Sequence, residues 1–222
     1  MNPLYLLDKV RVVLSHPSHP GNIGATARAM KTMGLSSLYL VNPRIFPDKD
    51  AEARAAGAWD ILNDAKVCAN LDEALNGTVL AAAITARPRE LLDHACQHPV
   101  ALVFGTEMSV LTTMEVSKCQ IVVHIPANPE YSSLNLASAV QIMAYELRMV
   151  LPELRSLSPV ANIAADFNDM ELLYRHLERV AISSGFLDPR EPKRFMQRMR
   201  RLFARARLEK EEVNLLRGML SA

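Results

Sequence analysis

The chain has 222 residues, half of them hydrophobic, and its 25 Lys and Arg against 24 Asp and Glu give a net charge of +1. This length allows one large domain or a domain with an appendage, and either can bury a hydrophobic core. No apolar run reaches the roughly 18 residues that a membrane span needs. The N-terminus also lacks the basic region, apolar stretch and small-residue cleavage site of a signal peptide. We therefore expect a soluble, cytoplasmic protein.

The first strand-length run is followed by "PGNIGATARAMKTMG", residues 20–34, which predicts a tight turn into a helix. Gly21 and Gly24 have the spacing G-x-x-G instead of G-x-G-x-x-G, and no acidic residue follows the second strand to bind a ribose, so we disfavour a dinucleotide site. Asn22 can cap the helix start. Arg28, about one and a half turns into the helix, is either a surface residue or part of an anion site beside the helix N-terminus.

Further apolar runs alternate with short helix-like segments that often end in Gly, a helix C-terminal signal. The runs are continuous, as is typical of strands buried on both faces of a parallel sheet. They span residues 10–15, 37–43, 65–69, 78–86, 100–105 and 121–126. This order predicts an α/β fold with an open parallel sheet of about six strands.

Cysteine and histidine patterns favour neither disulfides nor metal binding. The three cysteines are far apart and form no paired motif, so we expect reduced, structural thiols at Cys68, Cys96 and Cys119. His16 and His19 in "HPSHP" invite a metal interpretation, but the prolines hold this segment extended and no second Cys/His cluster supplies further ligands. We expect no metal site.

Two later stretches place polar groups near strand and helix ends. In "FGTEMSVLT", Gly105 ends a buried strand and Glu107 follows it, at the position where open α/β sheets bind ligands. In "NPEYSSLNLASA", Ser132 and Ser133 can cap the next helix. Asn135 in the first turn is harder to explain, because Asn caps helices better than it extends them.

The helix predicted after the last strand is apolar around much of its circumference. One stripe has spacings of three and four, and further apolar residues lie outside it. The stripe comprises Leu136, Val140, Met143, Leu147 and Val150; the others are Leu134, Ile142, Tyr145 and Met149. Such a helix is either deeply buried or packs on its own sheet and on a second surface, such as a dimer interface.

The C-terminal part differs in composition. We expect a sheet domain over residues 1–155, a linker over 156–166 and a helical extension over 167–222. Between residues 190 and 210, nine basic residues stand against two acidic ones. Such a run can be a solvated helix face, but in a nearly neutral protein it is also typical of a polyanion-binding surface. Contacts of this kind supply affinity and salt dependence without sequence choice.

In combination, these motifs resemble those of a known family. The order Asn22, Ala25 and Arg28, then "LVFGTE", then "IPANPEYSSLNLASAVQI" is similar to the three motifs of the SPOUT class, TrmH-like superfamily, of RNA methyltransferases. More narrowly, "SHPGNIGATARAMKTMGLSSLYLVNP", "TARPR", "NPEYSSLNLASAVQIMAYELR" and the tail "RMRRLFARARLEKEEVNLLRGML" resemble the TrmJ group of tRNA ribose 2′-O-methyltransferases. The resemblance covers essentially the whole chain.

The resemblance implies a C-terminal trefoil knot, an exception to the rule that chains avoid knots. It also implies S-adenosyl-L-methionine as cofactor, a homodimer through the apolar helix, and methylation of the pyrimidine at position 32 of the tRNA anticodon loop. By position, the cofactor would contact Ile84, Thr85, Ala86, Gly105, Ile125, Ser132, Ser133 and Leu134.

The chain departs from the family in its second motif, which usually runs G-[PR]-E-x-x-G-L-[ST]. Thr106 stands at the Pro/Arg position and Val110 at the second glycine. If that glycine has a positive φ, valine cannot replace it without strain, so the loop geometry must differ here.

The family's reaction is an in-line displacement in which a ribose 2′-hydroxyl attacks a sulfonium methyl group. Arg28 matches the arginine on which the family's catalysis is thought to depend. Because arginine keeps its proton in proteins, we expect a fixed cation that lowers the pKa of the hydroxyl and holds a phosphate. The other residues that the resemblance assigns to catalysis are Asn22, Glu107, Ser133 and Asn135; those assigned to RNA are Arg87, Arg89, Arg198, Arg201 and Arg205.

The sequence leaves two other functions to consider. A non-catalytic or differently targeted, rRNA-binding relative would fit the altered second motif and the basic tail. An NAD-dependent oxidoreductase is disfavoured by the glycine spacing.

Overall fold

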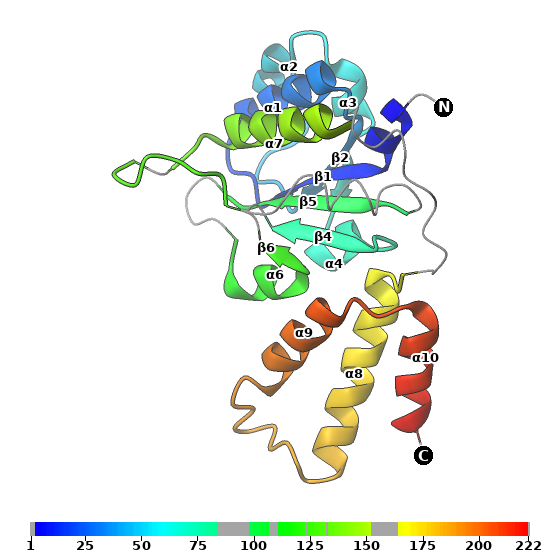
Figure 1. Ribbon diagram of the computed structural model, residues 1–222. Helices are drawn as coiled ribbons and strands as arrows, with labels where there is room; N and C mark the ends of the chain where they lie inside the picture. Colours follow the sequence, from blue (N-terminus) through cyan, green and yellow to red (C-terminus); the bar gives the residue numbers. More distant parts are fainter. Residues whose placement is uncertain are drawn as a thin grey trace.

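The computed structural model describes residues 3–83, 98–106, 111–122, 124–131, 133–151 and 164–221. Its sheet has six parallel strands in the order β3-β2-β1-β5-β4-β6, which confirms the predicted fold class (Figure 1). The strands are β1 Val10–Ser15, β2 Ser37–Val41, β3 Lys66–Cys68, β4 Leu80–Ala83, β5 Val100–Phe104 and β6 Ile121–Val122. β1 lies between β2 and β5 and pairs with both.

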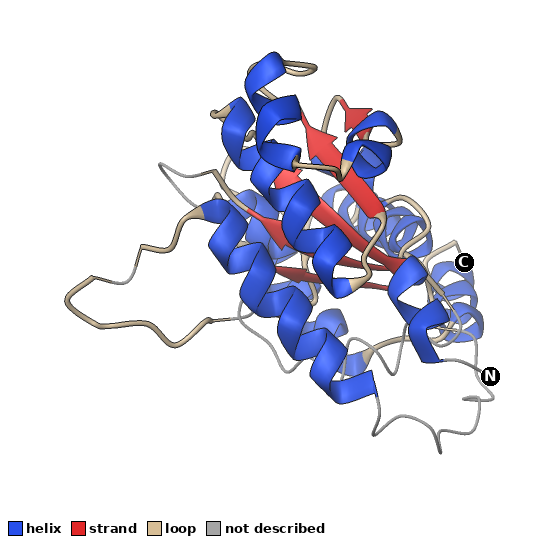
Figure 2. Cartoon of the chain, turned by 90° about the horizontal axis from the view of Figure 1, so that it is seen from above, coloured by secondary structure: helices blue, strands red, loops and turns tan. Residues whose placement is uncertain are grey.

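Helices cover both faces of the sheet. α1, α2, α3 and α7 lie on one face, and α4 and α6 lie on the other (Figure 1). Seen from above, the first of these layers runs across the strands beneath it (Figure 2). The bounds are η1 Pro3–Lys9, α1 Pro20–Met33, α2 Lys49–Ala55, α3 Trp59–Asn63, α4 Leu71–Leu75, α6 Thr113–Lys118, α7 Leu136–Val150, α8 Phe167–Ser183, α9 Phe195–Ala206 and α10 Lys210–Met219.

The central strands are buried on both faces, as their continuous apolar runs predict. On β1, Val12 and Leu14 belong to the core beneath α1 and α7, while Val13 belongs to the core on the α4 face. The expectation was wrong for the short edge strands. Val67 on β3 is 55% exposed and Val122 on β6 is 54% exposed, because these strands have a neighbour on one side only.

α1 begins earlier than its predicted cap allows. Pro20 is its first residue, where a missing N–H costs nothing, so Asn22 lies inside the first turn and does not cap the helix. Gly24 faces α2, and a Cβ at this position would overlap the carbonyl oxygen of Ala51. The glycine that resembles part of a phosphate loop therefore permits close packing of two helices.

The C-terminal helices α8, α9 and α10 form a separate unit below the α4 and α6 side of the sheet (Figure 1). They pack around their own apolar cluster, which includes Met170, Leu173, Tyr174 and Val213. Phe167 at the start of α8 joins the two units: its side chain is buried in the lower core of the sheet and its N–H donates to the Thr78 carbonyl at 2.7 Å.

Some expectations depend on residues outside the described ranges. Residues 84–97 and 107–110 fall outside these ranges, as does most of the predicted linker, 156–163. The knot and the domain boundaries stay predictions. Within the described residues, no helix is both long and apolar enough to cross a bilayer.

Candidate active site

Two of the predicted catalytic residues meet at the starts of α1 and α7. Asn135 Nδ2 donates to Asn22 Oδ1 at 3.0 Å, although 113 positions separate them. Asn135 Oδ1 accepts the N–H of Ala137 at 3.0 Å, so Asn135 is the N-cap of α7 and does not lie within its first turn. The cap position explains why an asparagine stands at the start of this helix. It also means that Ser133 does not occupy the cap position.

Further contacts show that α1 and α7 run in the same direction. Thr32 Oγ1 donates to Gln141 Oε1 at 3.4 Å, and Arg148 donates to the Met33 carbonyl at 3.0 Å. Since α1 follows a strand of a parallel sheet, both helices begin at its carboxyl edge. This edge is where open α/β sheets bind ligands.

Arg28 is exposed on α1. It lies roughly 9 Å further along the helix axis than Asn22 and about 120° around it. Within the described part of the chain, no hydrogen bond or ion pair holds its guanidinium. Ser133 is likewise exposed, two residues before the α7 cap. The structure thus joins Asn22 to Asn135 and leaves Arg28 available to an anionic ligand.

The predicted cofactor residues are described only in part. Gly105 directly follows β5, Ile125 packs against the core beneath α1 and α7, and Leu134 is 38% exposed next to the Asn135 cap. An adenosine group held by backbone and apolar contacts would fit here, because Gly105 leaves the backbone accessible after β5 and Ile125 and Leu134 supply apolar surface. The other residues assigned to this edge, Ile84, Thr85, Ala86, Arg87, Arg89, Glu107 and Ser132, lie outside the described residues, as does Val110 of the second motif.

Glu115 is a residue that the sequence analysis missed. It forms a capping box on α6, in which its Oε2 accepts the N–H and the hydroxyl of Thr112, each at 2.7 Å. Its Oε1 accepts a hydrogen bond from Ser15 and lies 3.7 Å from His16 Nδ1. The capping pattern T-x-x-E in "TTME" was a visible signal for the first role, but nothing local indicated the contact with β1.

The Glu115 carboxylate is stabilised as an anion. Its side chain is only 15% exposed. Burial raises its pKa, but the hydrogen bonds from Ser15 and Thr112, together with the nearby His16, outweigh burial and hold the pKa below its usual value. Glu115 is therefore ionised at neutral pH.

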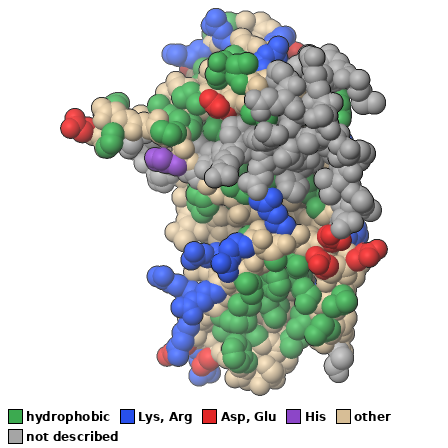
Figure 3. Space-filling model, in the orientation of Figure 1, with side chains coloured by type: hydrophobic (Ala, Val, Ile, Leu, Met, Phe, Trp, Pro, Cys, Tyr) green, Lys and Arg blue, Asp and Glu red, His purple; other side chains and the backbone are tan. Residues whose placement is uncertain are grey.

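The basic tail contains arginines of two kinds. Arg198, Arg201 and Arg205 are exposed and share one face of α9, since they are spaced by three and four residues. Figure 3 shows Lys and Arg side chains along the flank of the helical unit where α9 lies in Figure 1. Arg200 differs: it forms a two-pronged pair with Glu171, with NH2 2.8 Å from Oε2, and stacks 4.3 Å from the Tyr174 ring centre.

The exposed arginines and Arg28 lie on opposite sides of the sheet. α9 packs against α6 below the sheet, whereas α1 lies above it (Figure 1). A ligand that contacts both within one chain must therefore be large, as a folded RNA is.

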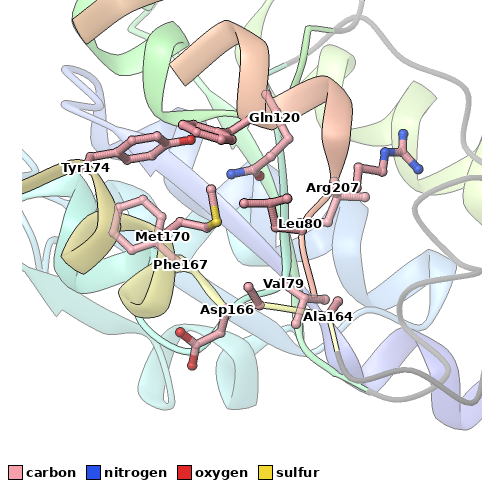
Figure 4. Close-up of a pocket in the computed structure, with 13 residues that line it drawn as sticks. Val79, Leu80, Gln120, Ala164, Asp166, Phe167, Met170, Tyr174 and Arg207 are labelled. Carbon is pink, nitrogen blue, oxygen red and sulfur yellow. The ribbon is translucent and has the colours of Figure 1, made fainter. Parts of the chain in front are cut away.

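A cavity of about 60 Å³ lies between the start of β4 and helices α8 and α9 (Figure 4). Leu80, Phe167, Met170 and Tyr174 are among its largely apolar lining residues, and none of the predicted site residues within the described ranges lines it. Ligand pockets usually enclose about 300 to 1,000 Å³. We therefore interpret this cavity as a packing gap between the two units.

Neither thiols nor metal ligands add to the described site. Cys68 and Cys119 are free and buried. Burial raises the pKa of Cys119 to about 12 and also raises that of Cys68, so both thiols are unreactive at neutral pH. Among the described residues, no three His, Cys, Asp or Glu side chains form a group that could hold a metal ion. Cys96 lies outside these residues.

The outer face of α7 is not buried within the chain. Ile142 is 36% exposed, and Tyr145 and Met149 are each 49% exposed, so the deeply buried alternative is wrong for this face. Leu136, Val140, Met143 and Leu147 on the opposite stripe are buried, as predicted.

An open parallel sheet with polar groups at its carboxyl edge and a basic helical extension is typical of an α/β enzyme whose substrate is a polyanion. The family model "SpoU rRNA Methylase family" matches residues 9–145, and "tRNA methyltransferase TrmJ, C-terminal domain" matches residues 168–222. The chain therefore belongs to the SpoU methylase family of methyltransferases and, within it, to the TrmJ group.

Individual relatives agree with this assignment. The chain is 46% identical to the tRNA (cytidine/uridine/adenosine-2′-O-)-methyltransferase TrmJ of Pseudomonas aeruginosa, over 97% of this chain and 94% of that protein. The crystal structure of TrmJ from Z. mobilis superposes with a TM-score of 0.82 at 30% identity, covering 95% of this chain and 97% of the other. A complex of the SpoU methyltransferase AviRb from Streptomyces viridochromogenes with the cofactor AdoMet has a TM-score of 0.55 at 23% identity, covers 64% of this chain and 57% of that one, and shares the fold.

Proposed function

We propose that this protein transfers a methyl group from S-adenosyl-L-methionine to the ribose 2′-hydroxyl of tRNA, at the pyrimidine at position 32 of the anticodon loop. The main support is the hydrogen bond between Asn22 and Asn135, which joins the first and third family motifs at the carboxyl edge of the sheet. Arg28 lies on the same helix as Asn22 and has no hydrogen-bond or ion-pair partner among the described residues. The name of the Pseudomonas relative supports tRNA and the 2′-oxygen as targets.

The residues at this edge suit the cofactor. Gly105, Ile125 and Leu134 would hold its adenosine part, with Ile84, Thr85, Ala86, Ser132 and Ser133 completing the site. When bound, S-adenosyl-L-methionine supplies a methyl group that is activated by the adjacent positive sulfur. The AdoMet complex of AviRb, which shares the fold, supports this choice.

Arg28 acts as a fixed cation in this proposal. It lowers the pKa of the 2′-hydroxyl and holds an adjacent phosphate, because a guanidinium keeps its proton and donates in a planar fork. Asn135 contacts Asn22 and not Arg28, so its first role is to align α1 with α7. Its second amide N–H can donate to the substrate oxygen. We assign Ser133 and Glu107 to the same substrate contact.

The exposed arginine stripe of α9 supports RNA binding. Arg198, Arg201 and Arg205 present three cations on one helix face, which suits successive phosphates and gives salt-dependent affinity. Arg87 and Arg89 would hold phosphate near the cofactor. Arg200 is excluded from this role because Glu171 already neutralises it.

A homodimer is the second part of the proposal. The exposed Ile142, Tyr145 and Met149 give α7 an apolar outer face, and a second copy would remove this face from water.

The test is methyl transfer from labelled S-adenosyl-L-methionine to total tRNA, followed by mapping of the modified ribose. We expect label at a pyrimidine 32 ribose. Arg28→Ala should abolish transfer while calorimetry detects nearly unchanged cofactor affinity. Lys31→Ala is the matched control, since this cation is one turn further along α1 but is paired with Asp60 at 2.8 Å; it should stay active.

Three outcomes would contradict the proposal. Activity of Arg28→Ala with weakened cofactor binding would overturn the role of Arg28. Label in rRNA but not in tRNA would favour a differently targeted enzyme. RNA binding without cofactor binding or transfer would indicate a non-catalytic relative.

A further inference from the structure

We propose that Glu115 is a positioning residue for methyl transfer, which acts by tying α6 to the end of β1 through Ser15. The inference deepens the proposed function and rests on it, because methyl transfer is its readout. Glu115 need not contact the substrate or the cofactor in this role.

The two oxygens of the Glu115 carboxylate serve two different elements. Oε2 completes the capping box with Thr112, which is the last residue of the second motif. Oε1 accepts the hydroxyl of Ser15, whose Oγ is also 2.9 Å from His16 Nδ1. A capping box alone needs only the first of these contacts. The second is a tertiary link across 100 positions.

Ser15 lies at the end of β1, close in the chain to α1 and next to β5 in the sheet. It is 1% exposed. The next residue, His16, has a φ of 50°, and its N–H donates to the Val41 carbonyl at 2.8 Å, which fixes the chain as it leaves the sheet. α1, with Asn22 and Arg28, begins only at position 20. On the other side, β1 pairs with β5, which leads into Gly105.

The link adds to a weak anchoring of α6. This helix has six residues and no buried side chain, so its own helical stability contributes little to its position. It also packs against α9, and its Lys118 pairs with Asp72 of α4. A hydrogen bond from a buried hydroxyl to a carboxylate is among the stronger bonds available in proteins. The link therefore fixes the end of the second-motif loop relative to the strand that leads into Asn22 and Arg28.

The experiment compares Ser15→Ala, Glu115→Gln and the double variant in steady-state methyl transfer, with melting curves for each. Ser15→Ala removes the link, together with the contact between the Ser15 hydroxyl and His16 Nδ1, and leaves the capping box intact. Misplacement of reacting groups by about 1 Å can cost up to 100-fold in rate, so we expect each single variant to lower kcat by roughly 10-fold or more. The KM for tRNA should stay within about twofold, because α9 is untouched.

The double variant should be no slower than the slower single variant, because both substitutions break one link. Asn70→Ala is the matched stability control: Asn70 caps α4 by accepting the Glu73 N–H at 3.0 Å, away from the site. It should lower the melting temperature but leave kcat unchanged. Ser15→Thr keeps the hydroxyl and should retain more activity than Ser15→Ala.

Three results would each overturn the inference but not the proposed function. They are a wild-type kcat in Ser15→Ala, additive losses of kcat in the double variant, and a loss of kcat in Asn70→Ala equal to that in Ser15→Ala. Absence of tRNA methylation by the unaltered protein would overturn the proposed function and this inference with it.

Discussion

Replacing Gly24 by alanine would place a methyl group in the contact between α1 and α2. The new Cβ would overlap the carbonyl oxygen of Ala51 and lie 2.8 Å from its carbonyl carbon and 3.0 Å from its Cα. These are backbone atoms of a helix, so no rotamer change relieves the overlap. Since carbon atoms normally pack at about 3.5 Å or more, the helices must separate by roughly 1 Å.

The expected loss of stability follows from two opposing contributions. Alanine is favoured over glycine within a helix by about 1 kcal/mol, whereas overpacking a close contact costs about 1 to 3 kcal/mol. We take the upper value for overpacking, because the overlapping atoms belong to the backbone and relief requires the helices to move. The free energy of unfolding should therefore fall by about 2 kcal/mol. For a chain of this size, that corresponds to a melting temperature lower by about 4 to 8 °C.

Gly21→Ala is the matched control. A Cβ there would meet side-chain atoms only, Arg54 Nε at 2.6 Å and Cδ at 2.7 Å together with the Asp50 carboxylate, and both side chains are flexible. We expect stability from unchanged to about 1 kcal/mol higher. Urea and thermal unfolding followed by circular dichroism measure both variants, with cofactor affinity measured by calorimetry.

Equal stability of the two variants would refute the packing argument. A fully stable Gly24→Ala with lost cofactor affinity would indicate that the glycine turn binds a ligand after all.

Two further predictions concern the basic tail and the apolar helix. Arg201→Ala should weaken tRNA binding and lower the slope of log affinity against log salt by about 1, whereas Arg200→Ala should instead cost about 2 kcal/mol of stability by leaving Glu171 unpaired. Binding titrations at several salt concentrations and melting curves test this, and an equal change of slope in both variants would contradict it. Tyr145→Glu should shift the protein from dimer to monomer in sedimentation with its helical content retained; a monomeric unaltered protein would refute the dimer.

Local patterns were sufficient to predict the fold class. Continuous apolar runs predicted the buried central strands because a parallel sheet covered on both faces requires them. Gly34, with a φ of 86°, ends α1 as its position indicated. The resemblance of the motifs around Asn22, Arg28 and Asn135 to those of a known family nominated a methyl-transfer site.

The partners of these residues could not be read from the sequence. Asn22 meets Asn135, and Ser15 meets Glu115, because the sheet order and the parallel course of α1 and α7 bring remote segments together. Likewise, two adjacent arginines have different environments: Arg200 pairs with Glu171 of α8, while Arg201 is exposed to solvent. Periodicity within a segment specifies which side chains share a face.

The sequence by itself thus determined the strands, most helices and the residue types available for catalysis, since these depend on local propensity and burial pattern. Only the tertiary structure decided that Gly24 serves helix packing, that Asn135 is a cap joined to Asn22, and that Glu115 links α6 to the end of β1. Each of these depends on the distance between segments far apart along the chain, and that distance is set by how the layers pack.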